Sequence, residues 1–198
     1  MLKIHINIDD LFYSLGLQEL LKLFFNKLNV AISFSFGDER ELQYTPNVII
    51  HHFINGELYA CPQHIKFNAP ILIGVTNQKI NEKDLPNCFK GIITIGCKTS
   101  VEEFLKLLNI FTLNHLRDNT TTSYYKWVGC YNCKSIKLNP VQVNLLKMMA
   151  KGLSSKEAAN SINISIKTFY YYKRCIYKNF GLNCDSDMLN LVYKLGFV

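Results

Sequence analysis

The sequence lacks the long apolar runs of membrane proteins, since no stretch approaches the roughly 20 uncharged apolar residues that a spanning helix needs. Its first residues, MLKIHINIDDLF, include acids where an export signal has its apolar region, so we expect no export signal. The seven cysteines are scattered, which argues against a disulfide framework and for a reducing cytoplasm. No Ser-His-Asp set, glycine-rich phosphate loop or paired carboxylates stand out, so we expect no enzyme, cofactor or resident metal.

Acidic residues are scarce in the last third of the chain. Of the 22 Lys and Arg and the 15 Asp and Glu, nine basic and three acidic residues lie after residue 134, which leaves 13 and 12 before it. The net charge of +7 therefore divides into +6 on the last third and +1 on the rest. A basic module beside a nearly neutral one indicates a polyanion as partner.

Residues 1–118 alternate short apolar segments with connections, a pattern that predicts a parallel α/β sheet covered on both faces. The connections 36–46 and 54–70 are poor helices, so we expect an abbreviated domain. Ser100 and Glu103 have the spacing of a capping box. The expected strands and helices are strands 3–8, 30–35, 47–53, 71–75 and 91–95 and helices 11–25 and 100–116.

Residues 119–134 break this periodicity and are expected to link two domains. They include Cys130 and Cys133, a Cys-x-x-Cys pair. Zinc would require two further ligands, and the sequence offers no second pair of this kind. We interpret the pair as compositional, and a thiol or metal sensor stays open as the alternative.

Residues 135–198 read as four short helices. Asn139-Pro140 predicts the start of the first and Gly152 its end. Ser154 and Glu157 predict a capping box for a short helix that contains two alanines. A tight turn then leads to a third helix, and a fourth is expected at 185–197. Two short helices joined by a tight turn are typical of a helix-turn-helix, whose second helix lies in the DNA major groove.

The third helix spans ISIKTFYYYKRCIYKNFGL, residues 164–182, with four consecutive aromatic residues before two basic ones. Ser165 is the expected N-cap and Gly181 the expected C-terminal glycine. The spacing of Phe169, Tyr172, Ile176 and Phe180 makes one apolar stripe, so these residues are expected to face the core. The opposite side then presents tyrosine, lysine and arginine.

The stretch LNPVQVNLLKMMAKGLSSKEAANSINISIKTFYYYKRCIYKNFGL resembles the LuxR/FixJ-type DNA-binding domain along its whole length. It departs at Phe169 and Tyr172, where that family usually has Val and His, and we expect adjusted packing there. The resemblance implies base-reading side chains, phosphate contacts and a dimer formed through the last helix. Carried over by position, the base readers are Tyr170, Tyr171 and Arg174, the phosphate contacts are Ser154, Ser155, Lys156, Lys167, Thr168, Lys173 and Lys178, and the dimer candidates are Met188, Leu191, Val192 and Leu195. The alternative for the last four is packing within their own domain.

With that tail, residues 1–118 resemble the flavodoxin-like receiver domain of a two-component response regulator. The resemblance implies an acid pair for Mg²⁺ at Asp9 and Asp10 and a hydroxyl at Thr76, but His51-His52 stands where the phosphoacceptor Asp belongs. The expected lysine falls near 95–97, with Lys98 one register away. Imidazole is a poor substitute for a carboxylate toward Mg²⁺. The domain is therefore expected to be a degenerate receiver in which Asp9, Asp10, His52 and Thr76 line an inactive pocket, and phosphorylation of a histidine is the alternative.

Together these patterns predict a cytoplasmic bacterial transcription regulator that binds double-stranded promoter DNA independently of phosphorylation, as a homodimer and away from membranes. RNA polymerase is a candidate further partner. The alternatives are an auxiliary regulator that acts by heterodimerising with another DNA-binding protein, and the thiol or metal sensor named above.

Overall fold

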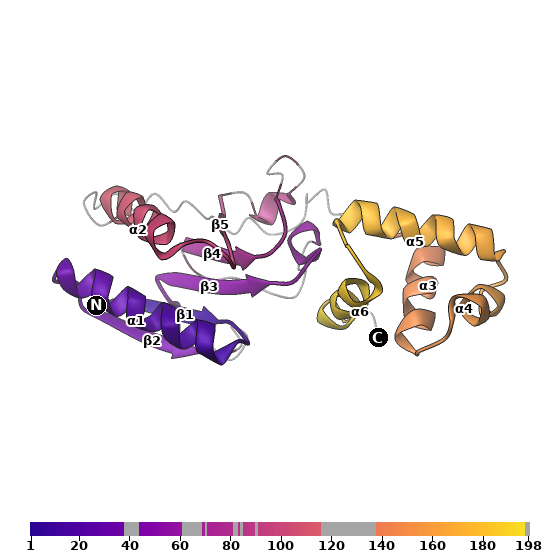
Figure 1. Ribbon diagram of the computed structural model, residues 1–198, viewed down its shortest axis with the longest axis horizontal. Coiled ribbons are helices and arrows are strands. Elements are labelled where there is room, and N and C mark those ends of the chain that lie inside the picture. The colour runs from indigo at the N-terminus through magenta and orange to yellow at the C-terminus, as the bar shows by residue number, and fades with distance from the viewer. Residues whose placement is uncertain are drawn as a thin grey trace. The chain divides into compact units, whose positions relative to one another are not determined.

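The computed structural model describes residues 1–37, 44–60, 69, 71–80, 83, 85–89, 91–115 and 138–196. The chain divides into two compact units, a sheet unit and a helical unit (Figure 1). The sheet unit comprises Met1–Phe53, Gln63–Asn77 and Cys88–Gly129, and the helical unit comprises Ile54–Pro62, Gln78–Asn87 and Cys130–Val198. Within the described residues, no helix has the length and apolar character needed to cross a bilayer.

Five parallel strands form one sheet in the order β2-β1-β3-β4-β5, as Figure 1 shows. The position of β1 between β2 and β3 is the flavodoxin-like arrangement expected from the order of segments. All five expected strands are present, with ends shifted by at most two residues. They are β1 (Leu2–Asn7), β2 (Ile32–Phe36), β3 (Val48–Phe53), β4 (Ile71–Thr76) and β5 (Ile93–Gly96).

Two helices pack on one face of this sheet. Leu17 and Leu21 of α1 (Leu11–Lys27) and Phe104 of α2 (Val101–His115) belong to the same buried cluster as alternate strand residues. Alternate residues of a strand point to the same face, so this cluster is built from one side of every central strand. Those strand residues are Ile4, Ile6, Val48, Ile50, Ile71, Ile73, Val75 and Ile95.

The opposite face of the sheet is also covered at β3 and β4, whose residues are nearly all buried. The ring of Phe53 lies edge-on to that of Phe89, with centroids 5.4 Å apart, and to His51 at 4.4 Å. In the described parts of the connections that follow β2 and β3, the only helical segment is the single 3-10 turn η2 (Glu57–Tyr59). A further turn, η4 (Asn87–Phe89), precedes β5. The abbreviation expected for these connections stays a prediction, because residues 38–43, 61–68 and 70 lie outside the described residues.

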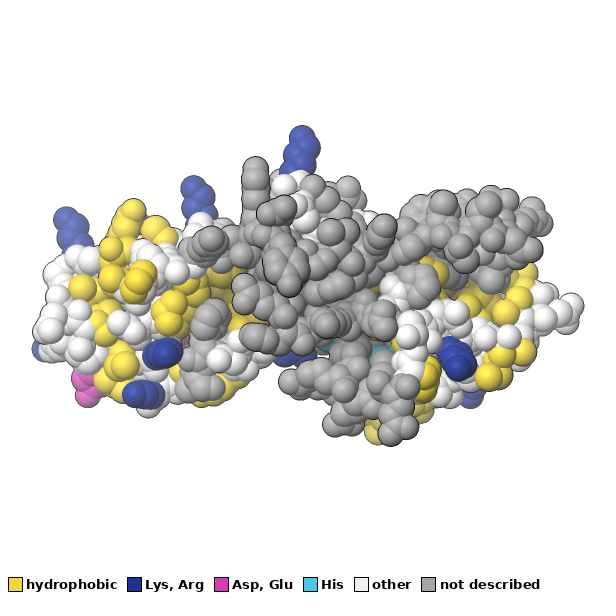
Figure 2. Space-filling view, turned by 180° about the vertical axis from the view of Figure 1, so that it is seen from behind, with side chains coloured by type: hydrophobic (Ala, Val, Ile, Leu, Met, Phe, Trp, Pro, Cys, Tyr) yellow, Lys and Arg dark blue, Asp and Glu magenta, His cyan; other side chains and the backbone are white. Residues whose placement is uncertain are grey.

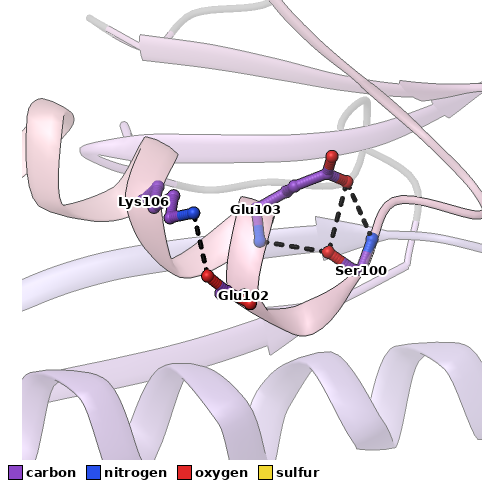
Figure 3. Close-up of polar contacts among 4 residues, drawn as sticks. All are labelled: Ser100, Glu102, Glu103 and Lys106. Atoms are coloured by element: carbon purple, nitrogen blue, oxygen red, sulfur yellow. Dashed lines mark hydrogen bonds and ion pairs between the residues drawn. The ribbon is translucent and has the colours of Figure 1, made fainter.

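The start of α2 has the predicted capping box (Figure 3). The Glu103 backbone N–H donates to Ser100 Oγ, and the Ser100 backbone N–H donates to Glu103 Oε2, both at 3.2 Å. One turn further, Lys106 Nζ lies 2.8 Å from Glu102 Oε1. The capping box pairs two N–H groups that the helix itself leaves without partners.

Within its described residues the helical unit contains four α-helices, the number that the sequence predicted. Their shared core includes Leu145, Phe169, Ile176 and Met188, each with 0% of its surface exposed. Tyr59 and Ala60, which follow β3 in the sequence, belong to the same cluster. The helices are α3 (Pro140–Ala150), α4 (Ser155–Ser161), α5 (Ile166–Phe180) and α6 (Asp185–Lys194).

Candidate nucleic-acid interface

Capping side chains fix where α3 and α4 begin. Asn139 Oδ1 accepts the Gln142 N–H at 2.8 Å, and Asn139 N–H donates to Gln142 Oε1 at 2.9 Å. Ser154 and Glu157 form the same reciprocal pair at the start of α4. Ala158 and Ala159 are buried, and their small side chains allow α4 to pack closely against α5. Short-range signals in the sequence therefore determine the helix-turn-helix.

Helix α5 is bounded as predicted. Ser165 Oγ accepts the Thr168 N–H at 3.0 Å, and the helix ends at Gly181, whose φ of 62° lies in the left-handed region that favours glycine. Phe169, Ile176 and Phe180 are at most 2% exposed, while Tyr172 is partly buried against the same cluster. The expected core stripe is confirmed, and it accommodates an aromatic ring at both positions that depart from the LuxR pattern.

The other side of α5 faces solvent. Tyr170 and Tyr171 are 49% and 63% exposed, and Arg174 is exposed beside them. The Cys175 thiol hydrogen-bonds Tyr171 and raises the pKa of that phenol. The residues expected at phosphates are largely exposed too: Ser154, Lys156, Lys167 and Lys178 are exposed, and Ser155 and Thr168 are partly so. Helix α5 and the preceding helix α4 thus present aromatic, hydroxyl and cationic groups to solvent.

Lys173 has a different arrangement from the other cations of α5. Its Nζ lies 2.7 Å from Asp185 Oδ1, and its side chain is only 15% exposed. The Tyr177 hydroxyl also donates to Asp185. Lys173 would have to leave Asp185 to reach a phosphate, so the contacts assign it first to holding α6 against α5.

The same cluster shifts two pKa values. Burial opposes ionisation of Asp185, but the hydrogen bonds from Lys173 and Tyr177 outweigh it and hold the pKa of this carboxyl below its usual value. Burial and the bond to Asp185 raise the pKa of Tyr177, which therefore stays protonated as a donor.

The three acids that follow residue 134 lie in the first turns of α4 and α6, and each accepts hydrogen bonds. Hydrogen bonds from Ser154 lower the pKa of Glu157. Asp185 is bound as described, and Asp187 Oδ2 accepts the Asn183 N–H at 2.9 Å. Figure 2 shows Lys and Arg side chains at several places on the helical unit, at the left of that view, among hydrophobic surface. Nine Lys and Arg residues follow residue 134 against these three acids, a balance that favours a positive potential on this part of the chain.

The C-terminus of α5 is capped by a residue that the sequence did not predict. Gln78 Nε2 donates to the carbonyls of Phe180 and Gly181, both at 3.0 Å, and its Oε1 accepts the Gly56 N–H at 2.9 Å. Carbonyls in the last turn of a helix have no partner inside the helix, so this amide satisfies groups that would otherwise need water. Gln78 lies 102 positions from Phe180, which is why no local pattern indicates the contact.

The apolar face of α6 packs inside the helical unit. Met188, Leu191 and Val192 are at most 4% exposed, and they line a small apolar pocket with Leu146, Ile176 and Phe180. Leu195 is partly exposed. Met188, Leu191 and Val192 therefore pack within their own domain, which was the alternative to a dimer contact.

Comparison with protein families gives a match in the last third of the chain. Residues 138–192 match the family of bacterial regulatory proteins, luxR family. This part of the chain is a luxR-family regulatory domain. A comparison with curated proteins found no match for the chain.

Solved structures match nearly the whole chain, including the residues that precede the luxR-family domain. One structure of the two-component response regulator RcsB in complex with DNA is 18% identical over 97% of this chain and 98% of that chain, with a TM-score of 0.55. A structure of two RcsB dimers bound to two parallel DNAs is 20% identical over 97% and 98%, with a TM-score of 0.54. RcsB from Salmonella enterica serovar Typhimurium, bound to promoter P1flhDC in the presence of BeF3-, is 18% identical over 96% and 97%, with a TM-score of 0.56. These likenesses show a response-regulator fold in front of the luxR-family domain.

The residues expected to line a receiver pocket follow β1 or lie in β3 and β4. Asp10 is the N-cap of α1, where its Oδ1 accepts the Tyr13 N–H at 2.9 Å, and Asp9 is exposed. Thr76 is buried as the last residue of β4, and His51 and His52 lie in β3 near its end. Lys98 follows β5 and is exposed. The interpretation of the acids as helix N-terminal residues thus describes Asp10.

The Cys-x-x-Cys pair, Cys130 and Cys133, lies outside the described residues, as does the whole expected linker at 119–134. The described part of the chain holds no group of three or more His, Cys, Asp or Glu side chains arranged to bind a metal ion.

Proposed function

We propose that this protein is a sequence-specific transcription regulator that binds double-stranded DNA through α5. One observation supports this most directly. The same helix buries Phe169 and Ile176 completely while Tyr170, Tyr171 and Arg174 face solvent. A helix-turn-helix reads base edges with the outward side of its second helix. Aromatic and guanidinium groups on that side suit contacts to thymine methyl groups and to guanine.

The side chains divide into two roles under this proposal. Arg174 pairs with guanine in the major groove, with Tyr170 and Tyr171 beside it. The remaining exposed hydroxyl and lysine groups bind phosphates and orient the domain without reading sequence. These are Ser154, Ser155, Lys156, Lys167, Thr168 and Lys178, with Lys173 joining them only if it leaves Asp185.

Competition titrations on selected and scrambled DNA test these roles. Arg174→Ala should weaken binding to the selected DNA by about 1–3 kcal/mol, because a bidentate contact discriminates between bases. It should change binding to the scrambled DNA little. Lys178→Ala should weaken both DNAs alike and reduce the salt slope by about 0.9, the value for one phosphate contact. Lys147→Ala, at an exposed position of α3, is the matched control for the loss of a positive charge elsewhere in the domain. Equal binding of selected and scrambled DNA by the unaltered protein would contradict the proposal and favour the auxiliary regulator that heterodimerises.

We further propose that the response-regulator unit works without aspartyl phosphorylation. Support comes from the histidines in β3 and from Asp10, whose carboxylate is engaged at the start of α1. Acetyl phosphate with Mg²⁺ should leave the mass, oligomeric state and DNA affinity unchanged. A mass increase of one phosphoryl group together with tighter DNA binding would overturn this part.

The protein is proposed to act in the bacterial cytoplasm as a dimer and not as an enzyme, with RNA polymerase as a candidate partner at promoters. The alternative role as a thiol or metal sensor is tested with a double variant in which Ser replaces both Cys130 and Cys133. DNA affinity should then be the same under reducing and oxidising conditions. Zinc bound to the unaltered protein and absent from the double variant would support the sensor.

A further inference from the structure

The first two turns of α5 carry three large side chains whose apolar surface faces solvent. Ile166, Tyr170 and Tyr171 are 44%, 49% and 63% exposed. Ile166 and Tyr170 are four residues apart, so their side chains are neighbours on the helix surface. The N-terminal residues of the second helix in a helix-turn-helix contact base edges. We call these three residues the apolar reading surface, because under the proposed function they meet the bases.

The hydroxyl of Tyr171 is already engaged within α5. A hydrogen bond joins it to the thiol of Cys175, which lies one turn further on and is partly buried. This bond raises the pKa of the phenol, as expected when the hydroxyl is the donor. A tyrosine hydroxyl has one proton to donate, so Tyr171 cannot donate to a base while the bond is intact. The group that Tyr171 offers to DNA is therefore its ring.

Both exposed rings are also held by a second ring beside them. The ring of Tyr170 lies edge-on to that of Phe169, with centroids 5.8 Å apart and an angle of 88° between the planes. The ring of Tyr171 lies edge-on to that of Tyr172, at 5.5 Å and 63°. Phe169 is fully buried and Tyr172 is partly buried, so each exposed ring rests against a ring of the core side. Such packing restricts rotation and presents an oriented apolar surface to the groove.

An apolar reader distinguishes one base from the others. In the major groove thymine alone presents an apolar group, its C5-methyl, whereas the other bases present hydrogen-bond donors and acceptors. Arg174 lies three residues after Tyr171, which is about 4.5 Å along the helix axis. Successive base pairs are about 3.4 Å apart, so the guanidinium meets the groove one to two base pairs from the rings. The surface therefore suits thymines that are followed at this spacing by a guanine.

From these observations we propose that the apolar reading surface selects DNA by thymine methyl groups, and that Cys175 is a positioning residue that holds the ring of Tyr171 for this contact. The rings of Tyr170 and Tyr171 make the contact, and their hydroxyls donate no hydrogen bond to a base. The inference rests on the proposed function, since it names the chemical group that α5 reads. It adds Cys175, which acts through Tyr171 and not through DNA.

Deoxyuridine tests the contact without altering the protein. It lacks only the C5-methyl of thymine and keeps the same base pair, so selected DNA is prepared with each thymine replaced in turn. At the contacted positions binding should weaken about fourfold, the value for one buried CH₂-sized group. At one of those positions Tyr171→Ala should remove the difference between thymine and deoxyuridine, and at another Tyr170→Ala should remove it. Melting curves check that both variants are folded.

Two outcomes of this experiment separate the inference from the proposed function. Deoxyuridine that is neutral at every position, in a protein that still prefers selected to scrambled DNA, would overturn the inference and leave the proposed function intact. Equal binding of selected and scrambled DNA would contradict the proposed function itself, and the inference with it.

Variants that keep the ring test whether a hydroxyl reads the base. Tyr170→Phe should bind selected DNA as the unaltered protein does and keep its sensitivity to deoxyuridine. Tyr193→Ala, which removes a tyrosine that is 60% exposed on α6, is the matched control and should leave binding unchanged. A loss in Tyr170→Phe as large as that in Tyr170→Ala would show that the hydroxyl is the reading group and would overturn reading by the ring.

The positioning role of Cys175 is tested by combining two variants. Cys175→Ala and Tyr171→Phe each remove the same hydrogen bond, so each should weaken binding to selected DNA about two- to tenfold, as expected when a side chain must be ordered on binding. Together they should weaken binding no more than either one alone, because the bond can be lost only once. Cys175→Ser keeps a hydrogen-bonding group and should restore binding, and Cys184→Ala, at an exposed cysteine of the same unit, is the control. Losses that multiply in the double variant, or a neutral Cys175→Ala, would overturn this role.

Discussion

In the sheet unit, Asp10 accepts the backbone N–H of Tyr13 at the start of α1. In the helical unit, Glu157 accepts the backbone N–H of Ser154 at the start of α4. The chemistry is the same, since a carboxylate near a helix N-terminus pairs an open donor and interacts favourably with the helix dipole. The consequences differ between the units. Capping engages an acid that a receiver pocket would use for Mg²⁺, whereas after residue 134 it engages one of only three acids in a segment that has nine basic residues.

The role of an acidic residue therefore depends on the groups that it contacts, and not on the number of acids in its segment. Two acids after the first strand suggest a metal site, and three acids in a basic domain suggest neutralisation. Four of these five acids form hydrogen bonds that the structure assigns to helix starts or to the α5–α6 contact, and Asp9 is exposed.

The largest effect is expected at Phe169. Phe169→Ala should lower the free energy of unfolding of the helical unit by about 3–5 kcal/mol, because the ring is fully buried and its removal leaves a cavity. Tyr170→Ala is the matched control on the outward side and should change stability by less than about 1 kcal/mol. Urea unfolding followed by the helical circular dichroism signal measures both. Equal losses for the two variants would show that α5 is turned differently.

A smaller effect is expected at Gln78. Gln78→Ala should lower the free energy of unfolding of the helical unit by about 1–3 kcal/mol, because two helix carbonyls and the Gly56 N–H lose their partner. Gln78→Glu keeps the shape but replaces the donor with a negative charge at a helix C-terminus, so it should be at least as destabilising. Denaturant unfolding compares them with exposed Lys79→Ala as control. Unchanged stability in both variants would show that residue 78 does not stabilise the helical unit.

Next is the N-cap of α1. Asp10→Ala should cost the sheet unit about 1 kcal/mol, and Asp9→Ala, at an exposed position, less than about 0.5 kcal/mol. Adding Mg²⁺ should not change the melting temperature of the unaltered protein. An increase with Mg²⁺ that is lost in both variants would instead show that the acid pair binds the metal.

The smallest effect is expected from pH. The pKa of Asp185 is lowered in the folded state, so its contribution to stability is present above the unfolded pKa of about 4 and is lost as the pH falls through the folded pKa. Its side chain is 53% exposed, which limits the contribution to less than about 1 kcal/mol. Asp185→Asn should therefore show a flatter loss of stability than the unaltered protein below pH 4 in thermal unfolding. Parallel curves would indicate that the Lys173–Asp185 pair contributes nothing measurable.

Much of this fold could be predicted from short stretches of sequence. The strands and helices follow from apolar spacing, and the caps at Asn139, Ser154 and Ser165 follow from residue types three positions apart. These signals work because backbone pairing and capping are local, and each requires only neighbours within one turn. The two sides of α5 were predictable for the same reason, since helical periodicity alone separates Phe169 from Tyr170.

Contacts between distant segments were not predictable in this way. The family resemblance implies a phosphate contact for Lys173 and a dimer contact for Met188, and neither pattern indicated that Lys173 pairs with Asp185 or that Met188 is fully buried. Gln78 caps a helix that lies 102 residues away. The strands, the helices and the charge of each part could be read from the sequence, because these depend on local geometry and composition. Tertiary structure alone decided which polar groups are engaged and which apolar residues remain exposed, because burial depends on which distant segments pack together.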